Sequence, residues 1–183
     1  PTDSEGVDRV FSDLASAYAA TVSGRDDVIL LDANTSHKVT SMLTIDKNRC
    51  HFIGLDMGDR IQNQRCLISN TGAGAATDVS MVKITGTGNT FRNISFKNNW
   101  TVAQNLSAVL DYSNNSLFKN CSFQNLGSAH LTNANAAALI LASGDPEFID
   151  CSIGADTLQS TVASGQTLLI KKPIYGKSEA GLF

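Results

Sequence analysis

One seven-residue phrase occurs three times in this chain and constrains its fold more than any other feature. The copies span residues 90–96 (TFRNISF), 117–123 (LFKNCSF) and 147–153 (EFIDCSI), so the repeat steps are 27 and 30 residues. An apolar residue stands nine positions before the phenylalanine of each copy, at Val82, Val109 and Leu139. Self-similarity at this period is typical of a solenoid, in which each repeat forms one coil and buries its apolar side against the neighbouring coils.

The repeats are made of strands rather than helices. The run Ser80–Ile84 is rich in apolar and β-branched residues and is followed by Gly86 and Gly88, and the run Ala138–Ala142 is followed by Gly144 and Pro146. Glycine and proline at these places favour turns. The apolar runs are too short and too interrupted for the three- and four-residue spacing that a helical repeat needs.

The phrase also predicts a bend in the chain. Ile94 and Phe96 share one side of a strand, but Phe91 would face the other side unless the chain turns at Asn93. Asparagine and aspartate tolerate the left-handed conformation that such a corner requires. Stacked coils then place equivalent residues of adjacent repeats above one another, about 4.8 Å apart. The predicted ladders are Phe91, Phe118 and Phe148; Ile94, Cys121 and Cys151; Phe96, Phe123 and Ile153; and, at the corner, Asn93, Asn120 and Asp150.

Residues 4–22 are expected to form an amphipathic helix that covers the open end of the solenoid. One face of this helix would carry Val7, Val10, Phe11, Leu14 and Tyr18, with Asp3 or Ser4 as the N-cap. We therefore expect an all-β parallel solenoid with an N-terminal capping helix, divided into residues 1–27 and 28–183. The strand-like run at residues 166–170 and Phe183 restate the repeat, which favours a solenoid that continues beyond the given C-terminus.

Charge and cysteine content narrow the function classes. The net charge is −3 and the pI is near 5.5, which gives no general attraction to nucleic acid, and no apolar run is long enough to span a membrane. The four cysteines are expected to be buried thiols in a protein made in a reducing cytoplasm. A disulfide and a metal site are the alternatives, although the chain has no C-x-x-C pair and its three histidines are scattered.

Three groups of residues are candidate sites. The polar stretch 56–65 could bind a cation or a sugar, or form a solvated loop or an interface; its interface candidates are Arg60, Gln62, Gln64 and Arg65. Asp111, Glu147 and Asp150 could form an acidic cluster of the kind that glycosidases use, or serve as structural residues. Trp100 could stack on a sugar or pack inside the protein. No recognised nucleophile, phosphate-binding or metalloprotease motif is present, and we expect no catalytic residue, cofactor or metal.

The Phe-x-Asn-[Ile/Cys]-Ser-Phe coils and the helix that precedes them resemble the right-handed parallel β-helix proteins of the pectate-lyase-like superfamily. That resemblance implies the fold rather than an activity. The clustered calcium-binding aspartates and the Asn-Thr-Asp and Arg-Ile-Lys phrases of its pectinolytic members are missing here. Residues 49–54 (RCHFIG), residues 58–60 (GDR) and the Asn-Cys-Ser-Phe coils resemble β-helix proteins of tailed-bacteriophage particles instead.

This resemblance leads to a functional expectation. The chain is expected to be a non-enzymatic virion structural protein that decorates or cements a capsid, bound to the major capsid protein or other virion subunits. A homo-oligomer is expected, with a trimer preferred, and no nucleic-acid or membrane partner. The alternative is a tailspike or fibre-type adhesin that binds, and could also cleave, a host glycan.

Overall fold

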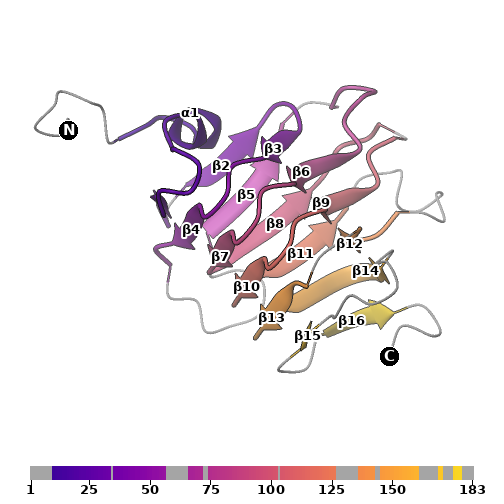
Figure 1. Cartoon of the computed structure of the whole chain (residues 1–183). Helices are drawn as coiled ribbons and strands as arrows, with labels where there is room; N and C mark the ends of the chain where they lie inside the picture. Colours follow the sequence, from indigo (N-terminus) through magenta and orange to yellow (C-terminus); the bar gives the residue numbers. More distant parts are fainter. Residues whose placement is uncertain are drawn as a thin grey trace, which may run out of the picture.

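The computed structural model is a right-handed parallel β-helix, described over residues 10–33, 35–56, 66–71, 74–102, 104–126, 136–142, 145–160, 169–170 and 175–178. Within these residues every strand pair is parallel, and successive coils lie side by side along the solenoid axis (Figure 1). No helix in the described part is long and apolar enough to cross a membrane. The predicted fold class is confirmed.

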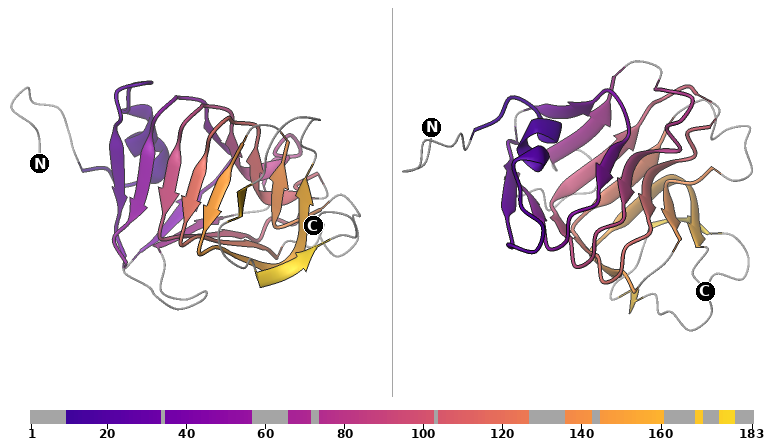
Figure 2. Two further views of the ribbon diagram at one scale, coloured as in Figure 1. Left: turned by 60° about the horizontal axis from the view of Figure 1, so that its bottom comes forward. Right: turned by 45° about the horizontal axis from the view of Figure 1, so that its top comes forward.

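Three strand-built faces surround the core (Figure 2). Face A consists of β1 (Val28–Leu31), β4 (His51–Gly54), β7 (Thr90–Arg92), β10 (Leu117–Lys119), β13 (Glu147–Ile149) and β15 (Leu169–Ile170). Face B consists of β2 (Ser36–Val39), β5 (Cys66–Asn70), β8 (Ile94–Asn98), β11 (Ser122–Asn125) and the start of β14 (Ser152–Ser160). Face C consists of β3 (Leu43–Ile45), β6 (Ser80–Ile84), β9 (Ser107–Asp111), β12 (Leu139–Leu141) and the end of β14, which also pairs with β16 (Tyr175–Ser178).

A column of stacked phenylalanines runs through the core behind face A. Phe91, Phe118 and Phe148 are register partners, and their ring centroids are 5.0 and 5.1 Å apart. The predicted ladder is therefore confirmed, and it is longer than the repeated phrase indicated. Phe52 stacks on Phe91 at 5.0 Å, and Tyr18 of the capping helix lies 6.1 Å from Phe52. Stacked aromatic pairs of this kind stabilise a core beyond the area that they bury.

The predicted corner lies between faces A and B. Asn93, Asn120 and Asp150 have φ angles of 57°, 52° and 54°, in the left-handed region. The side chain of Asn93 donates to the carbonyl of Gly54 at 3.3 Å. No residue larger than glycine fits at position 54, because a Cβ on Gly54 would lie 2.2 Å from the Asn93 carbonyl oxygen.

A second left-handed corner precedes face A and was not predicted. Asp26, Arg49, Gly88 and Asn115 all have positive φ, and each stands two residues before a face A strand. The Arg49 guanidinium donates to Asp26, with an Nε to Oδ1 distance of 2.8 Å, and this hydrogen bond holds the pKa of Asp26 near 2. Sequence reading missed this corner because four residue types occupy it and arginine is not a usual left-handed residue.

A second stack of asparagines lies at the ends of the face B strands. Asn98 donates from Nδ2 to Oδ1 of Asn125 at 2.9 Å, and Asn125 donates to the carbonyls of Leu106 and Ala137. Asn98 and Asn125 are buried, so their amides satisfy backbone groups that water cannot reach. The next coil carries Ala155 at the equivalent place, and β14 runs there without a break from face B into face C.

The N-terminal helix is present but shorter than predicted. The helix α1 spans Leu14–Ala19, and Asp13 is its N-cap, accepting a hydrogen bond from the backbone N–H of Ser16. The predicted span of 4–22 was wrong for residues 10–13 and 20–22, which are not helical, and the N-cap candidates Asp3 and Ser4 lie outside the described residues. Val10 and Phe11, which were expected on the apolar face, are exposed, whereas Leu14 and Tyr18 are buried on the core.

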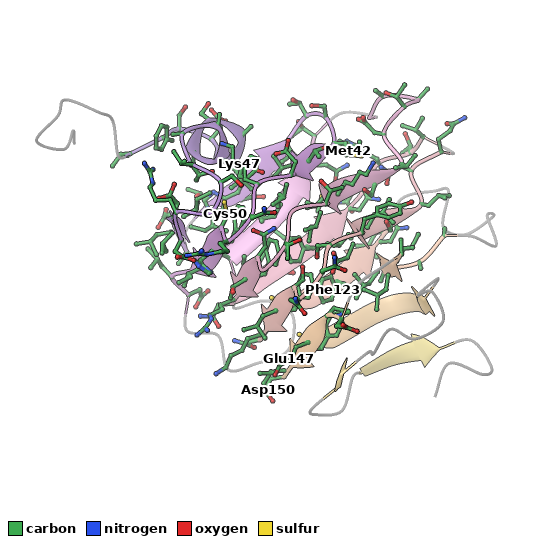
Figure 3. The ribbon with its side chains drawn as sticks, in the orientation of Figure 1. Met42, Lys47, Cys50, Phe123, Glu147 and Asp150 are labelled. Atoms are coloured by element: carbon green, nitrogen blue, oxygen red, sulfur yellow. The ribbon has the colours of Figure 1, made fainter. Side chains whose placement is uncertain are left out.

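Tyr18 and Lys47 attach this helix to the first coil. Figure 3 shows Lys47 beside the helix. The Tyr18 hydroxyl accepts hydrogen bonds from the backbone N–H groups of Asp46 and Lys47, each at 2.7 Å, and donates to the Asp46 carboxylate at 2.8 Å. The Lys47 ammonium donates to the carbonyls of Tyr18, Ala19 and Thr21 at 2.7–3.0 Å. These carbonyls lie at the C-terminal end of the helix, where a cation is favourable. The predicted capping role is consistent with these contacts.

Candidate functional site

The predicted interface residues cannot be placed. Arg60, Gln62, Gln64 and Arg65 lie outside the described residues, so their role stays a prediction.

The three carboxylates proposed as an acidic cluster lie on different parts of the coil. Asp111 ends β9 on face C and is buried, whereas Glu147 begins β13 on face A. Asp150 stands at the corner between faces A and B, and Figure 3 shows Glu147 and Asp150 near β13. The structural interpretation of Asp150 as a corner residue is thus confirmed. Across the described residues, no group of three or more His, Cys, Asp or Glu side chains is arranged to hold a metal ion.

Asp111 is a buried carboxyl group inside the turn that follows β9. Its Oδ1 accepts hydrogen bonds from the Ser113 backbone N–H at 2.9 Å and from the Ser113 hydroxyl at 2.5 Å. Its Oδ2 is buried without a hydrogen-bond partner among the described residues. Burial raises the pKa of Asp111 to about 6, against the smaller opposing effect of the serine hydrogen bonds. The geometry fits a turn-forming residue.

Trp100 packs inside the protein and does not form a sugar platform. Its side chain is fully buried, and its indole Nε1 donates to the carbonyl of Thr71 at 3.1 Å. Gly74 lies against the ring, because a Cβ there would come within 2.8 Å of it. The sugar-stacking alternative for Trp100 is therefore wrong.

The four cysteines are buried, as predicted. Cys66 lies in register with Ile94, and Cys121 and Cys151 occupy the same interior column in later coils. The thiols of Cys66, Cys121 and Cys151 each donate to a backbone carbonyl of a neighbouring coil, at 3.2–3.4 Å. Burial raises the pKa of the Cys50 and Cys66 thiols. These thiols act as small core residues.

An exposed aromatic ring stands on the outer side of face C. Tyr112 follows β9 directly, its backbone N–H donates to the carbonyl of Ile84, and 47% of its surface is exposed. The Lys83 ammonium lies 5.4 Å from the centre of the Tyr112 ring. Such an arrangement presents an apolar ring face next to a charged hydrogen-bond donor.

The same face carries a small apolar cluster and the polar side chains Lys83 and Thr85. Leu110 and Ile140 form an apolar cluster that is separate from the core, together with Leu106, Ala137 and Ala142. Lys83 pairs in register with Leu110, and Leu110 with Ile140, while Thr85 occupies the coil before Tyr112. Leu110 and Ile140 are themselves buried, so the surface that a ligand could reach consists of Lys83, Thr85 and Tyr112, which we call the Tyr112 platform. Sequence reading overlooked this platform because Tyr112 lies beyond the strand, in a turn where only the coil stacking brings it beside Lys83.

Comparison with solved structures identifies the same fold in pectin methylesterases. Pectin methylesterase PemA from Erwinia chrysanthemi superposes with a TM-score of 0.56 at 17% sequence identity, over 88% of this chain and 51% of that chain. Two crystal structures of pectin methylesterase in complex with hexasaccharides superpose with TM-scores of 0.51, at 17% and 16% identity, over 86% of this chain and 55% of theirs. No protein-family model and no curated protein sequence matches the chain.

These comparisons support the fold and correct one expectation. The chain spans about half the length of the pectin methylesterases that it resembles, and the low identity makes the likeness one of fold. The expectation of a non-enzymatic protein is contradicted, because the similar solved structures are enzymes. The parallel β-helix is thus shared with pectin methylesterases, and two of the similar crystal structures contain a hexasaccharide.

Proposed function

We propose that this chain is the β-helix of a glycan-binding bacteriophage virion protein of the tailspike or fibre class. The observation that carries the proposal is the Tyr112 platform, an exposed ring beside a lysine and a threonine on the outer side of face C. Sugars offer apolar C–H faces and hydroxyl groups, so an aromatic ring flanked by hydrogen-bonding side chains matches both parts of a glycan. Binding sites of this kind combine aromatic area with a few placed polar groups.

Two further observations support a glycan ligand. The platform stands on parallel strands whose coils repeat about every 4.8 Å, so it is rigid and extended along the axis. The solved structures that share the fold include two of pectin methylesterase in complex with a hexasaccharide.

The virion location rests on the resemblance of residues 49–54 and of the Asn-Cys-Ser-Phe coils to phage particle proteins.

Calorimetry with oligosaccharides tests the platform directly. We expect binding to at least one hexasaccharide from a panel of neutral and uronic-acid sugars, weakened roughly tenfold in Tyr112→Ala. Tyr112→Phe retains the ring and should bind nearly as well as the parent. Trp100→Phe serves as a control for an aromatic residue that is buried away from the surface. Equal affinity in the parent and Tyr112→Ala would remove Tyr112 from the site.

Immunogold labelling of purified particles tests the virion location. A tailspike or fibre protein would be labelled on the tail. Label on the head would favour the capsid, and particles without label would remove the virion assignment.

An exposed apolar patch favours a second candidate, a capsid-decorating subunit. Val28, Leu30 and Leu55 are each more than half exposed at the first coils of face A. Large exposed apolar side chains that lie together are typical of protein interfaces. This patch would contact the major capsid protein, another virion subunit or a second copy of the chain, with a trimer as the preferred oligomer. Val28→Asp with Leu30→Asp should then lower the mass measured by light scattering or the occupancy on particles.

A further inference from the structure

Two cations stand side by side on the outer side of face A. Arg92 of β7 and Lys119 of β10 are register partners on adjacent parallel strands, which lie about 4.8 Å apart. Both side chains are exposed, while their neighbours Phe91 and Phe118 point into the core. The β-helix therefore holds two positive charges close together on its surface.

Like charges directly opposite each other destabilise a sheet. No carboxylate of the described residues lies within 4.0 Å of either cation, because the ion pairs of that part of the chain involve only Arg25, Asp27, Asp26, Arg49 and His51. The repulsion between Arg92 and Lys119 is therefore not offset by a carboxylate within 4.0 Å among the described residues.

Along the solenoid axis, this pair is flanked by apolar side chains. Ile53 and Ile149 occupy the same outward row, one coil before Arg92 and one coil after Lys119. Among the described residues, the charged or titratable groups that lie next to the pair on this side are His51 and Glu147 in the neighbouring row and Asp150 at the corner. The cationic pair is consequently bounded along the axis by apolar side chains.

We propose that Arg92 and Lys119 together bind one doubly charged oxyanion, a phosphate or sulfate group, either free or as an ester on a surface polymer. Two negative charges neutralise both cations at once, whereas a single carboxylate would leave one of them uncompensated. The guanidinium of Arg92 can donate two parallel hydrogen bonds to such a group, and the Lys119 ammonium adds a point charge and a third donor. Face A carries this site, so it is separate from the Tyr112 platform on face C.

The net charge of the chain disfavours nucleic acid as the source of the phosphate. A nucleic-acid site is an extended basic surface, whereas this chain carries a net charge of −3. In addition, the outward row that contains the pair continues into isoleucine on both sides. The site therefore fits a single isolated dianion better than a continuous polyanionic backbone.

Thermal unfolding at constant ionic strength, in sodium phosphate, sodium sulfate, sodium acetate and sodium chloride, tests the proposal. A ligand that binds only the folded protein raises its melting temperature as its concentration rises. We expect phosphate and sulfate to raise the melting temperature above the acetate and chloride values. Arg92→Gln and Lys119→Gln should each weaken the fitted phosphate affinity roughly tenfold. Lys97→Gln is the matched control, because Lys97 points outward on face B opposite Gln124 and not opposite a cation.

A second measurement separates the sources of the anion. Titration of glucose 6-phosphate and inorganic phosphate, followed by the 31P signal, reports whether the ester or the free ion binds more tightly. Either preference supports the site and assigns the source of the anion.

In low salt without phosphate, Arg92→Gln should melt at a higher temperature than the parent, since one of the two repelling charges is removed. The proposal is overturned if phosphate has no more effect than chloride on the parent, or if its effect survives unchanged in both Arg92→Gln and Lys119→Gln.

Discussion

The side chain of Asn120 donates a 3.0 Å hydrogen bond to the side-chain oxygen of Asn93, one coil earlier. Both residues have left-handed backbone conformations, so the bond joins two corners that only a few residue types could form. This relationship makes the corner between faces A and B a stack of coupled turns. Each corner fixes the bend that allows Phe118 and Phe123 to enter the same core from different faces, and these two rings meet edge to face at 5.4 Å.

Two substitutions of Asn120 separate the contribution of its side-chain hydrogen bond to stability from that of its left-handed backbone conformation. Asn120→Ala loses the ladder hydrogen bond and also places alanine at a φ of 52°, so the free energy of unfolding should fall by about 2–3 kcal/mol. Asn120→Gly loses the hydrogen bond but tolerates the backbone conformation, and should cost about 1 kcal/mol. Urea denaturation of both variants measures the difference. Equal stability of the two variants would show that the conformation of this corner contributes nothing.

The stacked phenylalanine column predicts a large effect at its centre. Phe118 lies between Phe91 and Phe148, so Phe118→Ala opens a cavity with aromatic walls on two sides. We expect the free energy of unfolding to fall by about 3–5 kcal/mol. Phe118→Leu fills most of that volume and should cost clearly less. An alanine variant as stable as the parent would mean that Phe118 is not stacked in the core.

Asp111 predicts a pH dependence of stability. Its pKa is about 6 in the folded protein, against an ordinary value of 3.8 for the same carboxyl group when it is exposed in the unfolded chain. Between these values the folded state binds more protons than the unfolded state, so the free energy of unfolding falls as the pH rises from about 4 to about 6. The total change is about 3 kcal/mol for this group.

Asp111→Asn cannot ionise, so this component of the pH dependence should vanish in the variant while the Oδ1 hydrogen bonds remain possible. Chemical denaturation at pH 4, 5, 6 and 7 compares the two proteins. Parallel pH profiles for the parent and Asp111→Asn would contradict the assignment.

Gly86 predicts a steric effect in the turn between faces C and A. A Cβ at this position would lie 2.0 Å from the carbonyl oxygen of Lys47 in the preceding coil. Gly86→Ala should therefore force two coils apart and lower the melting temperature strongly. Gly24→Ala is the control, because nothing lies within 4 Å of a Cβ there and only its φ of 79° is strained. Equal melting temperatures in the two variants would argue against close stacking at Gly86.

The cysteines predict slow thiol chemistry. Cys50, Cys66, Cys121 and Cys151 are buried in the folded protein, so a thiol reagent should modify them much more slowly without denaturant than in urea. The ratio of the modification rates without and with urea should follow the fraction of protein that is unfolded or locally opened. Rapid native-state modification of more than one thiol, measured by mass spectrometry, would show that this part of the core is accessible.

The sequence by itself determined the architecture of the coils, because local chemistry repeats in it. The phenylalanine columns, the left-handed corner at Asn93, Asn120 and Asp150, and the stacking of Val82, Val109 and Leu139 in successive coils all follow from a phrase that recurs at nearly constant spacing. A stacked coil puts identical positions above one another, so sequence spacing converts directly into contact. Phe52 was missed as a member of the column because its coil has a longer connection to the next one, which removes the regular spacing.

Only the tertiary structure decided which polar and aromatic residues meet at the surface and in the turns. Trp100, Asp111 and Tyr112 all stand outside the repeated phrase, and their spacing does not say whether they face the core or solvent. Packing buries Trp100 against Gly74, encloses Asp111 within its turn and leaves Tyr112 exposed beside Lys83. The pairing of Arg92 with Lys119 is visible in the repeat, but its lack of a counter-ion among the described residues depends on where their carboxylates lie. Burial and long-range electrostatics are properties of the assembled coils, so these sites could not be assigned from the order of residues alone.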